Sequence, residues 1–181
     1  MTNLYTERLI LRELILEDTE NIFNAILNDK DTLHFLDWPY CDNLDEARNF
    51  VERLIENIEK LNYYFWVIEE KETNNFVGCI SICGSIPEKR MVEIEYVANT
   101  KFRGRGYMPE ANKRVMEYLI KECNIYRIEA VCNIENEASS RVMEKSGMKF
   151  EGILRGRALN LNAEGNPGDL KMYSLIPTDI N

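Results

Sequence analysis

The stretch KFRGRGYMPEANKRVMEYL, residues 101–119, decides how this chain folds. It begins with alternating arginines and glycines, follows the strand-like VEIEYVA of residues 92–98, and continues as a helix-like segment. A turn between a strand and a helix can direct successive backbone N–H groups at an anion, and the helix dipole adds partial positive charge there. Pro109 is expected at the first helical position, where no N–H is required. The donors would then lie at or before Met108.

Two well-known phosphate-binding patterns do not fit this stretch. The chain has no GxxxxGK[ST], and GxGxxG fails because Pro109 stands where the third glycine would be. A GRG turn by itself is more often just a turn. The local sequence therefore leaves two alternatives open, an anion-binding turn and a plain one.

The rest of the chain predicts a mixed α/β domain built on one large sheet. Helices are expected at about residues 18–27, at 44–61, from the glycine turn to about 123, and at roughly 137–146, where Gly147 fits the C-terminal stop. Strands are expected at about residues 8–14, 63–70, 76–83, 92–98, 126–133, 148–155 and 169–176. No repeat or linker interrupts this order, so we expect a single domain over residues 1–181.

Charge and composition exclude several classes of protein. With 45% hydrophobic residues, 181 positions are enough for one domain with a full core. A formal net charge of −9 argues against a surface that coats nucleic acid. Charged residues in the first 14 positions do not fit a signal peptide, and no apolar run approaches a membrane span. We expect a soluble, cytoplasmic protein without nucleic-acid or membrane partners.

The cysteines and the lone histidine do not indicate a metal centre. Five cysteines without a CxxC pair, with His34 as the single histidine, support neither a disulfide framework nor a zinc site. Cys79 and Cys83 share one face of a predicted strand, where buried free thiols are expected.

Taken together, these segments resemble the GNAT acetyltransferases. The pyrophosphate loop of that family follows [QR]xxGx[GA] after the fourth strand; Arg103 and Gly106 match it, and Met108 replaces the last glycine or alanine. NIENEASSRVMEKSGMKFEG, residues 133–152, is similar to the family segment NxxNxASxRVxExxGFxxEG. TERLILRELILEDTENIF and FLDWPYCDNLDEARNFVE resemble the RimJ/RimL-like branch, which acetylates the N-termini of ribosomal proteins. The resemblance covers residues 6 to about 175.

This resemblance implies a fold, a cosubstrate and a set of contacts. The fold would be a mixed, mostly antiparallel sheet of about seven strands, splayed between strands 4 and 5 and flanked by about four helices. Acetyl-CoA would lie in that cleft, with pantetheine along residues 96–98 and pyrophosphate on residues 103–108, and no metal would be needed. The implied cofactor-binding residues are Tyr96, Val97, Ala98, Arg103, Gly104, Arg105, Gly106, Tyr107, Met108, Asn133, Asn136, Ser139 and Arg141.

Acetyl transfer needs a neutral amine, a polarised thioester carbonyl and a proton for the departing thiolate. The resemblance implies that a backbone N–H near Val97 donates to the thioester carbonyl oxygen. It implies Ser139 as the proton donor or water holder for the thiolate, and Asn136 as the residue that orients the pantetheine or the thiol. Glu93 and Glu95 share one face of their strand, so either could accept the amine proton through water. Both could equally lie on a solvated face, and Glu95 could instead narrow the acceptor site.

The candidate acceptors can be compared by the pKa of their amines. An α-amine with a pKa of about 8 is about a tenth neutral at pH 7, whereas a lysine near 10.4 is roughly a thousandth neutral or less. An N-terminal α-amine of a protein or peptide is favoured; polyamines and amine antibiotics stay open, as does a module that binds acyl-CoA without catalysis. Trp38 and Pro39 either line the acceptor pocket or anchor a loop. A homodimer is common among the proteins that the chain resembles.

Overall fold

The computed structural model describes residues 2–61, 64–158 and 165–180. The chain folds into two compact units, and each is described by itself below. Unit 1 comprises Met1–Ile82 and Tyr96–Ala111; unit 2 comprises Cys83–Glu95 and Asn112–Asn181. Because each unit combines two separate stretches of sequence, no single point in the chain divides them. The single domain stays a prediction.

The strands form a mixed sheet in the order β1-β2-β3-β4-β5-β6-β8-β7. The β5–β6 pair is parallel, and the pairs β1–β2, β2–β3, β3–β4, β6–β8 and β7–β8 are antiparallel. The bounds are β1 Leu4–Tyr5, β2 Leu9–Glu13, β3 Phe65–Glu70, β4 Phe76–Ile86, β5 Met91–Ala98, β6 Arg127–Asn133, β7 Lys149–Leu154 and β8 Leu170–Leu175. The predicted α/β class is confirmed. The strand beyond the expected seven is β1, whose two residues are too few to show an alternating pattern.

The helices of unit 1 include the long, capped α3. It covers Leu44–Leu61, as its apolar period predicts. Asn43 accepts a hydrogen bond from the Glu46 N–H through Oδ1 at 3.0 Å, and the Glu46 carboxylate accepts one from Asn43 Nδ2 in return. The bond from Glu46 N–H satisfies one of the backbone groups that the first helical turn leaves without a partner.

The N-terminal helical region of unit 1 is less regular than its sequence suggests. The single helix predicted for 18–27 is a 3₁₀ turn at Leu16–Asp18, α1 at Thr19–Ile22 and a π-helical turn at Phe23–Leu27. A four-residue helix, α2 at Lys30–Leu33, follows and was not predicted, because one helical turn carries too little periodicity.

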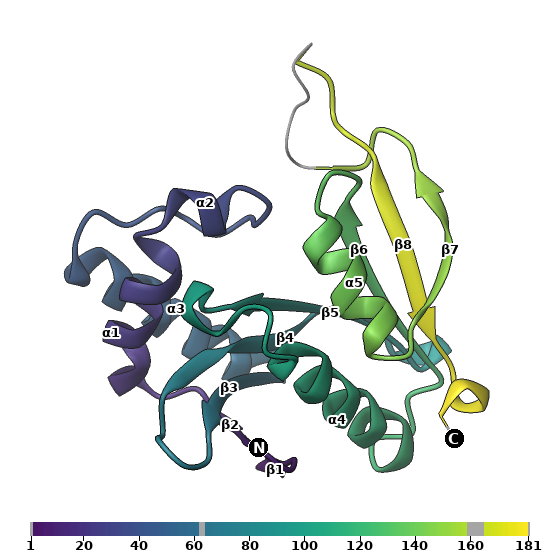
Figure 1. Cartoon of the computed structure of the whole chain (residues 1–181), viewed down its shortest axis with the longest axis horizontal. Helices are drawn as coiled ribbons and strands as arrows, with labels where there is room; N and C mark the ends of the chain where they lie inside the picture. Colours follow the sequence, from purple (N-terminus) through teal and green to yellow (C-terminus); the bar gives the residue numbers. More distant parts are fainter. Residues whose placement is uncertain (1, 62–63, 159–164, 181) are drawn as a thin grey trace. The chain divides into compact units, whose positions relative to one another are not determined.

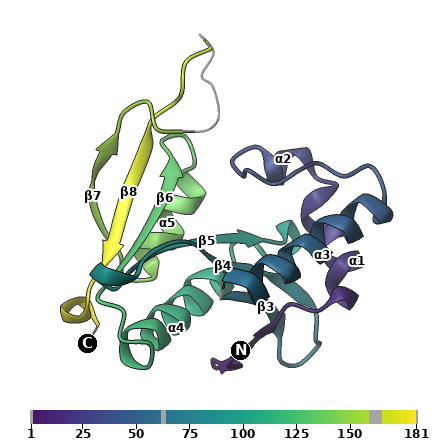
Figure 2. The same cartoon turned by 180° about the vertical axis from the view of Figure 1, so that it is seen from behind.

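The core of unit 1 lies between α1, α3 and the sheet (Figure 2). Ile22 and Ile26, Ala47 and Val51, and strand residues such as Val67 pack together there. Trp38 packs against this cluster, with its ring centroid 5.3 Å from that of Phe50 and 6.2 Å from that of Phe65. This packing favours the loop-anchor reading of Trp38.

Gly78 permits a close approach of β4 to β5 in unit 1. A Cβ built on Gly78 would stand 2.2 Å from the Val97 carbonyl oxygen and 3.1 Å from the Met108 side chain. Since the φ angle of Gly78 is 154°, a larger residue would be both strained and in collision with backbone.

Unit 2 contains the first part of β5, then β6, β8 and β7. In Figure 1, α5, Glu137–Lys145, lies alongside β6 and β8. Its buried residues Ser140 and Met143 face the sheet side that carries Ile128 and Ala130. The described pairing of β5 with β6 covers only three residues on each strand, Met91 to Glu93 opposite Arg127 to Glu129.

Three 3₁₀ turns and α4 complete the described elements. The turns are Pro87–Lys89, Thr100–Phe102 and Pro177–Asp179. The helix α4, Tyr107–Lys121, starts in unit 1 and ends in unit 2. Within the described ranges, no helix is both long and apolar enough to cross a membrane.

The cysteines partly depart from expectation. Cys79 is buried as predicted, whereas Cys83 is exposed and its thiol donates to the Glu93 carbonyl oxygen at 3.5 Å. The expectation of burial fails at Cys83 because β4 runs on to Ile86 and its last four residues are largely open to solvent.

Candidate active site

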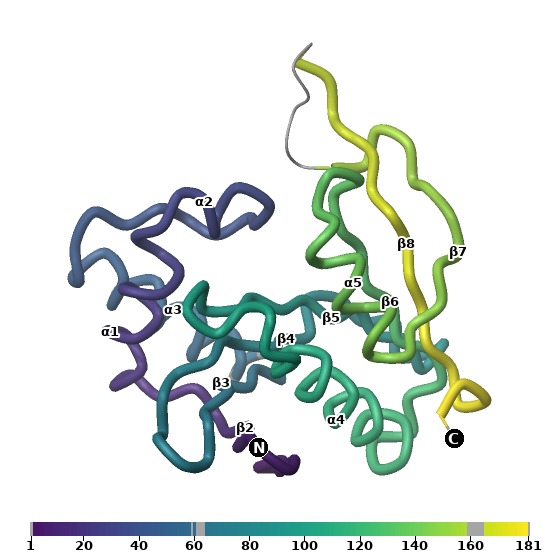
Figure 3. The backbone as a smooth tube through the Cα atoms, viewed as in Figure 1, coloured from purple at the N-terminus to yellow at the C-terminus, as the bar shows by residue number. Residues whose placement is uncertain are grey.

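The glycine turn between β5 and α4 has the backbone that its sequence requires. Gly104 and Gly106 have φ angles of 78° and 79°, a left-handed conformation that glycine adopts most readily. Figure 3 follows the chain from β5 through this loop into α4. The helix begins at Tyr107, so Pro109 is its third residue. The prediction that Pro109 would be the first helical residue is therefore wrong. The third position also leaves an N–H without an intrahelical partner, so proline is tolerated there as well.

Five consecutive backbone amides are left open at this turn. In the described part of the chain, the N–H groups of residues 104–108 donate to no other group, whereas Glu110 N–H already bonds to the Gly106 carbonyl at 3.2 Å. A Cβ built on Gly104 would meet nothing within 4 Å. The first turn of a helix with open amides and free space before it is suited to an anion such as a pyrophosphate.

An ion pair from β2 holds this loop in place. Arg8 donates from Nε to Glu110 Oε2 at 2.7 Å and from Nη1 to the Arg105 carbonyl at 3.0 Å. Thr6 Oγ1 donates to Glu110 Oε1 at 2.5 Å. Burial alone would raise the pKa of Glu110, but these hydrogen bonds from Thr6 and Arg8 lower it below its ordinary value. Sequence reasoning missed Arg8, because its partners are about a hundred positions away.

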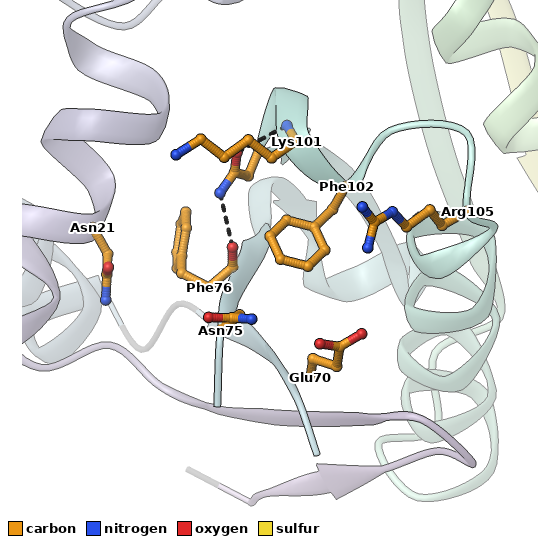
Figure 4. A pocket seen from close by; sticks show the side chains of 8 residues that line it. Asn21, Glu70, Asn75, Phe76, Lys101, Phe102 and Arg105 are labelled. Carbon is orange, nitrogen blue, oxygen red and sulfur yellow. Dashed lines mark hydrogen bonds between the residues drawn. The ribbon is translucent and has the colours of Figure 1, made fainter. Parts of the chain in front are cut away.

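The two loop arginines have different surroundings. Arg103 Nη2 donates to Thr32 Oγ1 of α2 at 3.0 Å. Arg105 is exposed, and its guanidinium carbon lies 5.1 Å from the centroid of the Phe102 ring. Arg105 also lines a pocket of about 440 Å³ in unit 1, shown in Figure 4. Its other lining residues are Asn21, Glu70, Asn75, Phe76, Asn99, Lys101 and Phe102.

The end of β5 in unit 1 carries the three residues assigned to pantetheine. Val97 is buried and its carbonyl faces Gly78 of β4, while Asn99 N–H donates to the Val77 carbonyl at 2.9 Å. Because backbone groups alternate between the two edges of a strand, those of Tyr96 and Ala98 point away from β4. The interval between buried residues lengthens from two positions to three after Ile94, so the alternation of buried residues along β5 is interrupted there.

Glu93 and Glu95 occupy the first part of β5 in unit 2. Glu93 lies opposite Glu129 of β6, and Arg127 Nε donates to Glu129 Oε1 at 2.7 Å. Arg127 also pairs with Glu151, while the Glu93 carboxylate has no ion pair or hydrogen bond among the described residues. Burial raises the pKa of Glu93, and the nearby Glu129 carboxylate raises it further. A half-buried carboxylate of this kind is suited to accepting a proton.

The first turn of α5 in unit 2 carries the polar residues assigned to the thiol. Asn136 is the N-cap, and its Oδ1 accepts a hydrogen bond from the Ser139 N–H at 3.0 Å. Asn133 Oδ1 accepts one from Glu135 N–H at 2.9 Å, so it too supports the turn. Ser139 is partly buried, and Arg141 is exposed. Asn136 Nδ2 donates to no group in the described ranges and remains available.

The sequence of residues 8–149 matches the family described as Acetyltransferase (GNAT) domain. This match covers well over half of the chain, and the chain therefore belongs to the GNAT family. Members of this family transfer an acyl group, and this chain is an acetyl-CoA-dependent N-acetyltransferase.

Three similar proteins illustrate this relationship. The uncharacterized N-acetyltransferase YoaA of Bacillus subtilis is 28% identical over 96% of both chains. A GNAT-family acetyltransferase from Bacillus anthracis is 27% identical, with a TM-score of 0.81 over 97% of this chain and 98% of that one. The ribosomal L7/L12 α-N-protein acetyltransferase RimL, in a structure with coenzyme A, is 23% identical, with a TM-score of 0.84 over the same shares of the two chains.

Proposed function

We propose that this chain transfers the acetyl group of acetyl-CoA to the N-terminal α-amine of a protein or peptide. The observation that carries the proposal is the run of five open amides at residues 104–108, held by two glycines with positive φ angles. These amides would bind the pyrophosphate of the cosubstrate. The likeness to RimL, an α-N-protein acetyltransferase, supports the choice of acceptor.

Glu93 is the proposed general base for the amine. A carboxylate that is half-buried and unpaired in the described structure, with a raised pKa, takes up a proton more readily than a solvated one. The amine nitrogen then attacks the thioester carbonyl, and the carbon–sulfur bond breaks. Because an α-amine is already about a tenth neutral near pH 7, one moderately basic carboxylate is enough for this step.

Ser139 and Asn136 are the proposed groups for the departing thiolate. Ser139 would supply or relay the proton that the sulfur needs. Asn136 caps α5 through Oδ1, which leaves Nδ2 as the donor that could orient the pantetheine or thiol. Capping also fixes the position of Ser139, so one side chain serves both roles.

A small polyamine is the second candidate acceptor. Glu93 and Glu129 are partly exposed carboxylates on neighbouring strands, and Arg127 pairs with Glu129 but not with Glu93 in the described structure. Such a surface attracts cationic molecules, in keeping with the net charge of −9. The two candidates differ in the acceptor and agree on acetyl-CoA.

A free-thiol assay with acetyl-CoA would separate these candidates. The acceptors would be peptides with a free N-terminus, the same peptides with an acetylated N-terminus and an internal lysine, polyamines and amine antibiotics. We expect thiol release with free N-termini and none with the blocked peptides. Release with polyamines alone would favour the second candidate. Calorimetric binding of CoA without release on any acceptor would instead favour a binding module, and no CoA binding would contradict the proposal.

A further inference from the structure

A lysine of β8 lies against the first turn of α5 in unit 2. Lys171 stands opposite Cys132 in the antiparallel β6–β8 pair. Its Nζ donates to Glu137 Oε1 at 2.6 Å and to Ser140 Oγ at 3.3 Å. The side chain is only 17% exposed, so the ammonium is held at this place in the fold. Figure 1 shows β8 and β6 next to α5.

A cation at this position runs against the usual arrangement. The N-terminal turn of a helix carries partial positive charge, and cationic side chains are normally stabilising at the opposite end. Glu137 compensates, because a charge-assisted hydrogen bond to its carboxylate stabilises the ammonium. This bond raises the pKa of Lys171, so the side chain stays charged throughout the neutral range.

The thiol and hydroxyl groups near Lys171 do not neutralise its positive charge. Burial raises the pKa of the Cys132 thiol, which therefore stays neutral. Tyr173 donates to Glu144 Oε1 at 3.1 Å, and burial raises the pKa of its hydroxyl as well. Glu137 is the one carboxylate bonded to Lys171 among the described residues, and its side chain is 62% exposed.

Ser140 links the ammonium to the residues assigned to the thiol. Its Oγ lies 3.3 Å from Lys171 Nζ, 3.4 Å from Cys132 Sγ and 3.4 Å from the Asn136 carbonyl oxygen, to which it donates. Ser140 is 2% exposed, so this arrangement is enclosed by protein. The neighbouring residue, Ser139, also interacts with the Cys132 thiol. The side chains of Ser140 and Cys132 thus connect the ammonium to Ser139.

We propose that Lys171 is a positioning residue for the thiol of CoA, acting through Ser140 and Glu137 on the first turn of α5. The inference rests on the proposed function, which assigns Asn136 and Ser139 to that thiol. When the carbon–sulfur bond breaks, its electron pair stays on sulfur. Positive charge fixed against the first turn of α5, which carries Ser139, favours this thiolate before its proton arrives.

The test is the pH dependence of CoA binding, because it requires no acceptor. Calorimetry would compare CoA with desulfo-CoA, which lacks the thiol, between about pH 6 and pH 9, a range that includes the ordinary thiol pKa of about 8.5. A protein that favours the thiolate lowers the pKa of the bound thiol. Affinity for CoA then increases as pH rises through that lowered pKa, while affinity for desulfo-CoA does not. For the wild type we expect the ratio of the two affinities to rise about tenfold, which is one pKa unit.

Four variants identify the source of this effect. Lys171→Met should reduce the rise to about twofold, and Lys171→Arg should retain most of it, because the charge is kept. Glu137→Gln should enlarge the rise, because it removes the compensating carboxylate and leaves the ammonium. Lys149→Met is the matched control: it removes another β-strand lysine that forms an ion pair, with Asp179, and should change nothing. Thermal unfolding of each variant would show that it is folded.

The outcomes separate this inference from the proposed function. If the wild type binds neither nucleotide, the proposed function fails and the role of Lys171 fails with it. If CoA and desulfo-CoA bind alike at every pH, the proposed function stands and the inference is overturned. It is also overturned if Lys171→Met leaves the ratio unchanged. Opposite responses of Lys171→Met and Glu137→Gln would support it even if one of the two variants were poorly folded.

Discussion

Two helices of this protein begin in opposite ways. The amides ahead of and within the first turn of α4 are open, from Gly104 to Met108. At α5, Asn136 caps the turn: its Oδ1 accepts from Ser139 N–H, and its carbonyl accepts from Ser140 N–H. A third interaction, the ion pair between Lys171 and Glu137, fastens that turn to β8.

The difference separates two uses of the same backbone chemistry. Open amides can bind an anionic ligand directly, and glycine makes room for them. The capped first turn of α5 has fewer such amides to offer, and we propose that it works through side chains that it holds in place. In the proposed enzyme, the α4 turn binds the cosubstrate and the α5 turn, with Glu93, serves the chemistry.

The largest expected effect is that of Glu93→Gln. The substitution removes the proposed base at nearly constant volume, so we expect kcat to fall by roughly 10²–10⁴-fold while CoA affinity is unchanged. The base must be ionised to act, and burial raises the pKa of Glu93. Activity of the wild type should therefore fall as pH drops through a value above the ordinary glutamate range, and the variant should lack this fall.

The matching measurement is a pH–rate profile of Glu95→Gln, with exposed Glu88→Gln as a control for general effects of charge. Loss of the acidic limb in Glu95→Gln alone would assign the base to Glu95. An unchanged rate in both variants would contradict a carboxylate base on β5.

Gly104→Ala should weaken the α4 turn as an anion site. A Cβ at Gly104 has space, but the φ angle of 78° costs an alanine roughly 1–2 kcal/mol, and relaxation would turn the amides away. We expect CoA affinity, measured by calorimetry, to fall about tenfold or more. Gly165→Ala is a matched control, since Gly165 has a φ angle of 79° and, among the described residues, equally open surroundings in unit 2. An equal loss in both variants would show that the loop amides do not bind CoA.

Substitutions at Asn136 distinguish its two proposed roles, the capping of α5 through Oδ1 and the binding of CoA through Nδ2. Asn136→Asp keeps an oxygen acceptor for Ser139 N–H and should preserve stability, whereas Asn136→Ala should lose about 1 kcal/mol of unfolding free energy. Both remove Nδ2, so both should weaken CoA binding, by roughly two- to tenfold for a single hydrogen bond. Urea unfolding and calorimetry together check this. Full CoA affinity in Asn136→Asp would mean that Asn136 is only a cap.

The smallest expected effect comes from the ion pair that supports the α4 turn. Glu110→Gln should lower stability by about 0.2–1 kcal/mol at neutral pH, because the pair with Arg8 is partly exposed. Since hydrogen bonds lower the pKa of Glu110, its contribution is present above its ordinary value of 4.5 and is lost as pH falls through the lower, native value. Urea unfolding of both proteins at about pH 7 and pH 3 would test this. A difference that persisted in acid would exclude the Glu110 carboxylate as its cause.

Much of the fold follows from periodicity alone. The apolar spacing of α3 and the strand-like apolar runs of β3, β4 and β6 predicted those elements to within about three residues. The turn ahead of α4 was predicted as well, because two closely spaced glycines between a strand-like and a helix-like segment are a strong local signal for a turn. Errors lie where the local signal is weak. The elements β1 and α2 each span only about one period of their structure, and Pro109 fits more than one position of a first helical turn.

The sequence by itself determined the family, the glycine turn and the residues that the family assigns to acetyl transfer, because each of these is encoded within a short stretch of chain. Only the tertiary structure decided which groups support them. Arg8 meets Glu110, Lys171 meets Glu137 and Ser140, and Glu93 meets Glu129, across separations of 31 to 102 positions for the hydrogen-bonded pairs. Such contacts depend on strand register and on the packing of whole elements, which no local pattern records.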